Sequence, residues 1–241
     1  SLVEKFLLKN KKVISLDSLI YKNTNNILSK NFDKNYSFVN FDIRNYKKLQ
    51  NQLDDIDNVI ILAGLVGDPI SKKYPNLSKK INENAIKNII DICFQNKTIK
   101  KLIFVSTCSN YGLIPEGTKA DEKYALNPLS LYSKSKVKIE NYILSKKKNT
   151  NIQPIILRFS TAFGLSSRMR FDLTINEFVL TMALNKNLIV YDENTWRPYC
   201  HVKDFADLIY KILYRINLDL SYEIFNVGNN DFNYTKKMIV D

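Results

Sequence analysis

Short apolar runs rich in β-branched residues alternate along this chain with longer segments of helical period. The run Val59-Ile60-Ile61-Leu62 is apolar at every position, as in a strand buried on both faces of a parallel sheet. This alternation is typical of βαβ units and predicts an α/β fold with a doubly wound parallel sheet and a smaller second lobe. We expect strands at Val13–Leu16, Ser37–Phe41, Val59–Leu62, Lys101–Ser106 and Ile152–Phe159, and helices at Leu2–Leu8, Tyr46–Leu53, Ile81–Gln95, Leu131–Ser145 and Phe171–Asn185.

The alternation weakens after Gly164, which suggests a change of architecture near residue 160. We expect residues 1–160 to form the main α/β domain. Residues 161–241 should form mostly the second lobe, with the segment from Arg197 to Gly228 returning to the main sheet. Ligands of a doubly wound fold bind at the carboxyl ends of its strands, so candidate site residues are sought there.

Composition excludes several classes of protein. The formal charge of +12 comes from lysines spread along all 241 residues, which indicates solvated surfaces and no nucleic-acid partner. No apolar run approaches the roughly 20 residues that cross a bilayer, and the first residues lack the order of a signal peptide, so we expect a soluble, cytoplasmic protein with no membrane partner. Cys93, Cys108, Cys200 and the single histidine, His201, show no metal-ligand spacing, and no metal is expected.

The segment Tyr132-Ser133-Lys134-Ser135-Lys136 carries a phenol and an ammonium four residues apart, on one face of the expected helix. A nearby ammonium is expected to lower the pKa of Tyr132, so that the phenol could exchange a proton with a hydroxyl near neutral pH. The alternative is an exposed pair on a helix surface.

The strand expected at Lys101–Ser106 runs into Ser106-Thr107-Cys108-Ser109, about 25 residues before Tyr132. Hydroxyls at a strand end lie at the edge of the sheet where ligands bind. A Ser or Thr there could hydrogen-bond a reacting hydroxyl, or it could cap the turn that follows.

These segments, in this order, resemble the extended short-chain dehydrogenase/reductases that act as nucleotide-sugar epimerases, dehydratases and reductases. The likeness covers nearly the whole chain and implies a Rossmann fold, NAD as cofactor, a nucleotide-diphosphate sugar as substrate and a catalytic set of Thr107, Tyr132 and Lys136. The family's first strand and glycine-rich turn have no counterpart, because the sequence holds no G-x-x-G-x-x-G or G-x-G-x-x-G. We expect both upstream of Ser1, and about 70 further residues after Asp241.

The resemblance also implies which residues contact NAD. Asp17, at the end of Val13-Ile14-Ser15-Leu16-Asp17, would bind the adenosine ribose and favour NAD over NADP. Asn82, in a pattern N-x-x-A-x-x-N with Ala85 and Asn88, would support the turn that lies under the cofactor. The full set of expected cofactor-binding residues is Asp17, Asp42, Ile43, Leu62, Ala63, Gly64, Asn82, Ser106, Tyr132, Lys136 and Phe159. Singly, Asp17 could cap a turn and Asp42 could close a loop.

Substrate contacts follow from the same resemblance. Arg197, in Arg197-Pro198-Tyr199-Cys200-His201-Val202-Lys203-Asp204, would meet the substrate's diphosphate through its planar fork of donors. Arg168 and Arg170 could hold phosphate or a sugar carboxylate, or be surface charge. The expected substrate-binding residues are Val66, Thr107, Cys108, Ser109, Thr161, Arg168, Arg170 and Arg197.

Three reactions share this scaffold. Sugar 4,6-dehydratases of the family carry an acidic residue shortly after the Thr107 position, where this chain has Cys108 and Ser109, and elimination of water then has no evident acid or base. We therefore favour an NAD-dependent nucleotide-sugar 4-epimerase, similar to the UDP-glucose 4-epimerases. A reductase of nucleotide 4-keto sugars is the alternative, and a non-catalytic nucleotide-binding relative is an alternative of another class. The resemblance further implies a homodimer whose interface includes Leu131–Ser145.

Overall fold

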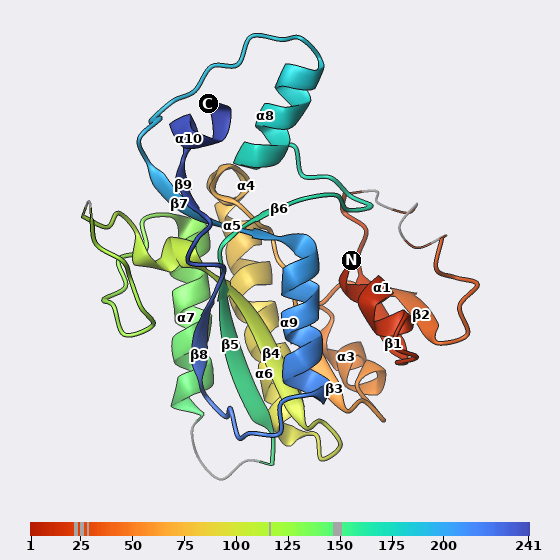
Figure 1. Ribbon diagram of the computed structural model, residues 1–241. Coiled ribbons are helices and arrows are strands. Elements are labelled where there is room, and N and C mark those ends of the chain that lie inside the picture. Colours follow the sequence, from red (N-terminus) through yellow and green to blue (C-terminus); the bar gives the residue numbers. More distant parts are fainter. Residues whose placement is uncertain (22–23, 25–26, 28, 116, 147–150) are drawn as a thin grey trace.

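Strands and helices alternate in the computed structural model, which describes residues 1–21, 24, 27, 29–115, 117–146 and 151–241 (Figure 1). Its strands are β1 Val13–Asp17, β2 Tyr36–Asn40, β3 Asn58–Ile61, β4 Lys101–Thr107, β5 Gln153–Phe159, β6 Thr161–Phe163, β7 Trp196–His201, β8 Ile224–Val227 and β9 Asn233–Thr235. Its α-helices are α1 Leu2–Leu7, α3 Tyr46–Gln52, α4 Asp68–Lys73, α5 Pro75–Lys79, α6 Ile86–Gln95, α7 Leu131–Ser145, α8 Thr174–Ala183, α9 Val202–Tyr214 and α10 Lys236–Val240. A π-helical turn, η1 Lys80–Ala85, precedes α6, and a 3₁₀ turn, η2 Cys108–Tyr111, follows β4.

The expected doubly wound α/β fold is confirmed, and the five expected strands lie within one residue of their predicted ends. The helix expected at Leu131–Ser145 has those bounds. The helix expected at Ile81–Gln95 begins instead as a π turn, and that expected at Phe171–Asn185 is shorter.

The main strands pair in parallel. β1 pairs with β2, and β3, β4, β5 and β8 form a four-stranded sheet in that order. Within the described part of the chain, no strand hydrogen-bonds β1 to β3, so the parallel strands form two separate sheets. The expected central strand upstream of Ser1 stays a prediction.

Helices cover both faces of the four-stranded sheet (Figure 1). On one face, Ile90 of α6 and Ile139 and Ile143 of α7 pack with Leu102 and Phe104 of β4. On the other face, a second cluster joins residues of α1 and α9 to β4 and β5, among them Phe6, Phe205, Ile209, Ile103 and Ile155. Burial of these apolar side chains is the main force that holds the layers together.

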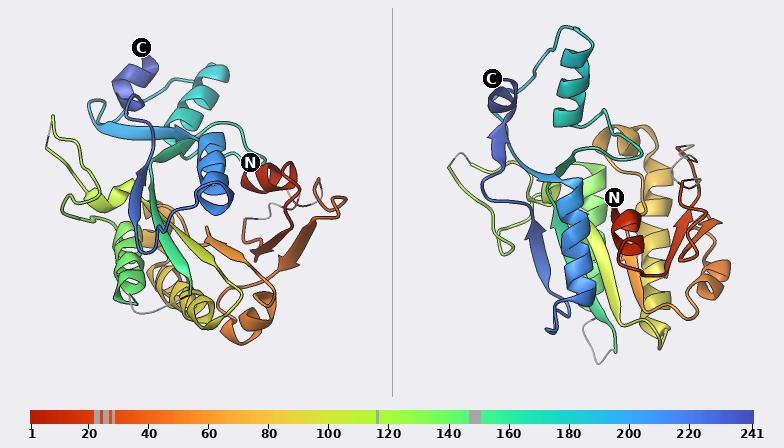
Figure 2. Two further views of the ribbon diagram at one scale, coloured as in Figure 1. Left: turned by 60° about the horizontal axis from the view of Figure 1, so that its bottom comes forward. Right: turned by 45° about the vertical axis from the view of Figure 1, so that its right-hand side comes forward.

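Beyond the carboxyl ends of the main strands, a small lobe contains β6, β7, β9, α8 and α10, and the C-terminus lies there (Figures 1 and 2). The chain returns to the main sheet through α9 and β8, which pairs with β5. The division at residue 160 stays a prediction. No described helix combines the length and apolarity needed to cross a membrane. In the same residues, no three His, Cys, Asp or Glu side chains form a group that could hold a metal ion.

Candidate active site

Helix α7 places Tyr132 and Lys136 on one face. Its start is fixed by a capping box in which the Ser130 hydroxyl accepts from the Ser133 backbone N–H at 3.1 Å and the Ser133 hydroxyl accepts from the Ser130 N–H at 3.2 Å. Lys136 lies one turn further on, 7% exposed, with its ammonium 5.8 Å from the centre of the Tyr132 ring. That ammonium donates to the carbonyl oxygen of Val105 at 2.7 Å.

The expected effect of Lys136 on Tyr132 is wrong in direction. The pKa of Tyr132 is raised above its ordinary value, first by burial and then by the neighbouring Cys108, and the cation that opposes this rise is Arg170. Spacing along a helix predicts how close the ammonium lies to the phenol. Burial of the phenol, which raises its pKa, has the larger effect. Burial also lowers the pKa of Lys136 to about 8, with the charge of Glu140 acting in the opposite direction.

Ser106 and Thr107 end β4 and point to opposite sides of it. The Thr107 hydroxyl accepts from the Ser109 backbone N–H at 3.2 Å and so caps η2. Ser106 is 2% exposed, and its hydroxyl donates to Glu140 at 2.5 Å. The Ser106 side chain is therefore engaged inside the protein, and the cofactor contact expected of this residue stays a prediction.

A buried ion pair behind β4 was missed by the sequence reasoning. Arg158 of β5, 3% exposed, donates from Nη2 to Glu140 Oε2 at 2.7 Å. Its Nη1 donates to the Tyr111 hydroxyl at 2.8 Å and to the Glu122 carbonyl at 3.2 Å. Two signals were available: Glu140 continues the four-residue spacing of Tyr132 and Lys136, and Arg158 interrupts the apolar strand Ile155–Phe159.

The turn after β3 is held by Asn82 of η1, as expected. The Asn82 side chain accepts from the Leu65 N–H at 2.8 Å and donates to the Leu65 carbonyl at 2.9 Å and to Ser78 at 3.1 Å. Gly64 has a φ of +154°, and a Cβ there would meet Asn82 Oδ1 at 2.9 Å, so only glycine fits without rearrangement. Of the neighbouring residues, Ala63 is half-buried, whereas Leu62 and Val66 are exposed.

Asp17 and Asp42 lie at the carboxyl ends of the neighbouring strands β1 and β2. The Asp17 carboxylate is exposed and accepts from the Leu19 N–H at 2.7 Å. The Arg44 guanidinium hydrogen-bonds the carboxyl of Asp42 and lowers its pKa. Ile43 is half-buried beside it. Each carboxylate thus accepts hydrogen bonds within the turn that follows it, which is the alternative role considered for each residue. The Asp17 carboxylate also faces solvent.

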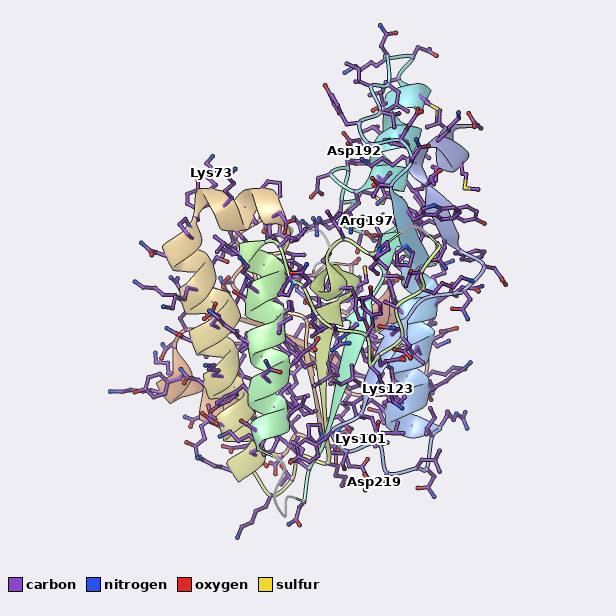
Figure 3. All side chains as sticks on the ribbon, turned by 90° about the vertical axis from the view of Figure 1, so that its left-hand side faces the viewer. Lys73, Lys101, Lys123, Asp192, Arg197 and Asp219 are labelled. Carbon is purple, nitrogen blue, oxygen red and sulfur yellow. The ribbon has the colours of Figure 1, made fainter. Side chains whose placement is uncertain are left out.

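The remaining expected residues lie around the start of the second lobe. Phe159 ends β5 and stacks on Phe205 of α9, with ring centroids 3.9 Å apart. Thr161 of β6 pairs in register with Tyr199 of β7. Arg197, exposed on β7, lies at the base of the second lobe, toward the other end of the main sheet from Lys101, which begins β4 (Figure 3). Burial raises the pKa of the Cys108 thiol, and the charge of Arg197 acts in the opposite direction.

Arg168 and Arg170 both have partners within the chain. The Arg168 guanidinium lies 3.9 Å from the centre of the Tyr21 ring. Arg170 pairs with Asp172 through Nε at 2.9 Å and Nη2 at 2.5 Å, and its charge also acts on Tyr132. The structure therefore brings Arg170, Tyr132, Cys108 and Arg197 into one electrostatic neighbourhood, while Arg168 packs on the segment after β1.

These residues fit the two ends of a dinucleotide. Asp17 offers an exposed carboxylate for ribose hydroxyls, and the Lys136 ammonium has three N–H donors, of which Val105 takes one. Between these ends lie the Gly64 turn, which has no side chain, and the exposed apolar Leu62 and Val66. For the pyrophosphate, the sequence offers no glycine-rich turn.

Comparison with known proteins was made at the level of family, sequence and structure. The model of the NAD dependent epimerase/dehydratase family matches residues 1–228. A putative UDP-glucose 4-epimerase of Methanocaldococcus jannaschii is 31% identical over 209 residues, covering 85% of this chain and 66% of that protein. A dTDP-D-glucose 4,6-dehydratase of Dictyostelium discoideum is 30% identical over 259 residues, covering 99% of this chain and 57% of that protein.

Among solved structures, the UDP-glucuronic acid 4-epimerase from Bacillus cereus, in complex with UDP-glucuronic acid and NAD, superposes with a TM-score of 0.85 at 26% identity. That match covers 95% of this chain and 73% of the epimerase. The chain spans 66% of the length of the Methanocaldococcus protein and 57% of the length of the Dictyostelium protein.

Proposed function

This chain belongs to the NAD dependent epimerase/dehydratase family, and we propose that it acts as an NAD-dependent nucleotide-sugar 4-epimerase. The observation that supports the proposal is that Lys136, 5.8 Å from the Tyr132 ring, binds the carbonyl of Val105 near the end of β4, the strand that ends at Thr107. Positions 108 and 109, which follow Thr107, carry no carboxylate. NAD, when bound, supplies reversible hydride transfer at C4 of the sugar.

Tyr132 would exchange the proton of the C4 hydroxyl. Burial raises the pKa of its phenol, so the side chain is a proton donor at rest and needs cationic neighbours before it can accept a proton. Arg170 supplies one positive charge and Lys136, one helical turn away, supplies another. Thr107 would hydrogen-bond the same hydroxyl, since its own hydroxyl can donate while it accepts from Ser109.

Lys136 would also hold the ribose of NAD through its unused N–H donors. Asp17 would bind the adenosine ribose, with Asp42 and Ile43 at the adenine. A carboxylate at the ribose repels a 2′-phosphate, which favours NAD over NADP. This suits a reaction in which the cofactor is regenerated within each turnover.

The substrate would be a nucleotide-diphosphate sugar, because the charge of the exposed Arg197 acts on Cys108, the residue after Thr107. A guanidinium there can bind two diphosphate oxygens at once. Thr161, Ser109 and Val66 would border the sugar, and Arg170 would contact it from the side of Tyr132.

Cys108 disfavours the dehydratase reaction, which needs a carboxyl to move protons at C5 and C6 of the sugar. Asp68, at the start of α4, is the carboxylate whose charge acts on Tyr132, and it raises the pKa of that phenol. It is exposed and lies on a different element from Thr107. The reductase of 4-keto sugars remains the second candidate, favoured by a phenol that is a proton donor at rest.

We extend the proposal to a homodimer built on α7 and a second helix of each subunit, in the cytoplasm, without a nucleic-acid or membrane partner. The test of the reaction is isotopic. A nucleotide sugar deuterated at C4 should give the C4 epimer with the deuterium retained at C4 and no net NADH. No conversion of the labelled sugar, with reduction of a nucleotide 4-keto sugar once NAD(P)H is supplied, would instead make the protein a reductase.

A further inference from the structure

Side chains of helix α7 hydrogen-bond to two consecutive residues near the end of β4, Val105 and Ser106. Tyr132, Lys136 and Glu140 follow one another at single-turn intervals on one face of the helix. Lys136 donates to the carbonyl of Val105 at 2.7 Å, and Glu140 accepts from the hydroxyl of Ser106 at 2.5 Å. The next residue of the strand is Thr107, so two buried bonds set the position of Tyr132 relative to Thr107.

The Glu140 carboxylate is fully buried, at 1% exposed, and every contact it makes is with a donor. Besides Ser106, the side-chain amide of Asn110 donates to it at 2.7 Å, and Arg158 donates from Nη2 at 2.7 Å and from Nε at 3.2 Å. A buried carboxylate so completely paired is held rigidly in place, whereas one that loses its partners is strongly destabilising.

Arg158 extends the connection to the chain segment that leads into α7. Its Nη1 donates to the hydroxyl of Tyr111 in η2, and that hydroxyl donates to the side chain of Asn226 in β8 at 2.6 Å. The same Nη1 reaches the carbonyl of Glu122, whose carboxylate accepts from the Asn226 N–H at 2.7 Å. The ion pair therefore links β4, β5, β8, η2 and α7 behind the triad.

Among the described residues, the titratable groups that face the Lys136 ammonium from its own helix are the neutral phenol of Tyr132 and the carboxylate of Glu140. From β5, Arg158 lies beyond that carboxylate. Strand β4 contributes only neutral groups, the Val105 carbonyl and the Phe104 ring at 4.6 Å. In η1, Glu83 pairs with Lys138, on another face of α7.

We propose that Glu140, held by Arg158, is a positioning residue that keeps Lys136 charged and fixes α7 against the end of β4 that carries Thr107. The inference rests on the proposed function for its effect on turnover, although the contacts themselves do not depend on it. Glu140 acts through Lys136 and Ser106 and does not touch the substrate.

The test is a pair of substitutions with opposite electrostatic effects. Glu140→Gln removes a negative charge near the Lys136 ammonium and leaves Arg158 unopposed, which should lower the pH at which Lys136 loses its proton by about one unit. Arg158→Met removes a positive charge and leaves Glu140 unopposed, which should raise that pH. The titration of Lys136 is followed by NMR of the intact protein with ¹⁵N-labelled lysine, with the signal assigned from Lys136→Arg.

Activity on a nucleotide sugar gives the second readout. In Glu140→Gln, the alkaline limb of the kcat profile should move to lower pH, with about a five-fold loss at pH 8 and KM nearly unchanged. Asp91→Asn is the matched control, because Asp91 binds Tyr142 and Lys146 at the far end of α7. It should leave both readouts as in the wild type.

Because either single change leaves a buried charge unpaired, Glu140→Gln/Arg158→Met is included as a variant without that penalty. It should fold and titrate Lys136 closer to the wild type than either single variant does, with turnover at pH 8 restored toward the wild type in the same measure. Unchanged Lys136 titration in both single variants, or shifts in the same direction, would overturn the proposal. A wild-type protein without activity on nucleotide sugars would refute the proposed function, while the NMR titration would still decide the role of Glu140.

Discussion

The ammonium of Lys136 lies 5.8 Å from the centre of the Tyr132 ring, one turn along α7, and is bonded to the carbonyl of Val105. This arrangement fixes the cation near the phenol without a direct bond between them. The phenol therefore keeps its hydroxyl free for a sugar, which is what proton exchange at C4 requires.

Tyr132→Phe should reduce turnover by about 10²–10⁴-fold, because it removes the group that exchanges the C4 proton. The affinity for NAD, measured by calorimetry, should stay nearly unchanged. Tyr142→Phe is the matched control on the same helix, since Tyr142 bonds to Asp91 away from the site. Near-normal turnover of Tyr132→Phe would remove this residue from the mechanism.

Lys136→Met should stabilise the protein at neutral pH while abolishing activity. Burial lowers the folded-state pKa of Lys136 from 10.5 to about 8, so at neutral pH folding must bury a charge that the unfolded chain keeps in water. The gain should be about 1–3 kcal/mol in the free energy of unfolding, at most what such a shift represents. Urea denaturation measures it, and Lys134→Met, at an exposed position of the same helix, should have no such effect.

The same shift predicts a pH dependence of stability. Between pH 8 and 10.5 the unfolded chain binds the proton of Lys136 more tightly than the folded protein does. The contribution of Lys136 to the free energy of unfolding therefore rises with pH across that window and is least favourable below it. Denaturation of the wild type and of Lys136→Met at pH 7 and pH 10 should show a difference that narrows as the pH rises. A constant difference would contradict the assignment.

Gly64→Ala should destabilise the protein by roughly 1–3 kcal/mol more than Gly117→Ala. Both glycines have positive φ, at +154° and +75°, but only at Gly64 would a Cβ collide with a neighbour, Asn82 Oδ1. Thermal denaturation compares the two variants, and NAD affinity should fall only in Gly64→Ala. Equal losses of stability would show that the contact with Asn82 does not matter.

Asp17→Asn should narrow the preference for NAD over NADP, because it removes the charge that repels a 2′-phosphate while keeping an oxygen for the Leu19 N–H. Dissociation constants for the two cofactors measure the ratio. Asp42→Asn serves as the control at the neighbouring strand end, where Arg44 already neutralises the carboxylate. An unchanged ratio in Asp17→Asn would place the ribose elsewhere.

The sequence allowed the fold to be predicted well, for a physical reason. Buried parallel strands such as Val59–Leu62 and Lys101–Ser106 are apolar throughout, and helix α7 carries its own start signal in Ser130 and Ser133. The position of Asn82 against the Gly64 turn could also be anticipated, from a family resemblance. Local patterns of this kind depend on neighbours in the chain.

What could not be predicted depends on burial and on contacts distant in the chain. Arg158 and Glu140 are 18 residues apart, and only the fold brings them together with Ser106, whose hydroxyl donates to Glu140. The rise in the pKa of Tyr132 likewise reflects how deeply the fold buries the phenol, which spacing to Lys136 does not reveal.

The most direct test of the central claim is proton NMR of nucleotide sugars incubated with the intact protein and NAD, without any added reductant. Interconversion of C4 epimers with no net NADH is the result that a 4-epimerase predicts. No change until a nucleotide 4-keto sugar and NAD(P)H are supplied, followed by its reduction, would contradict the epimerase and establish the reductase instead.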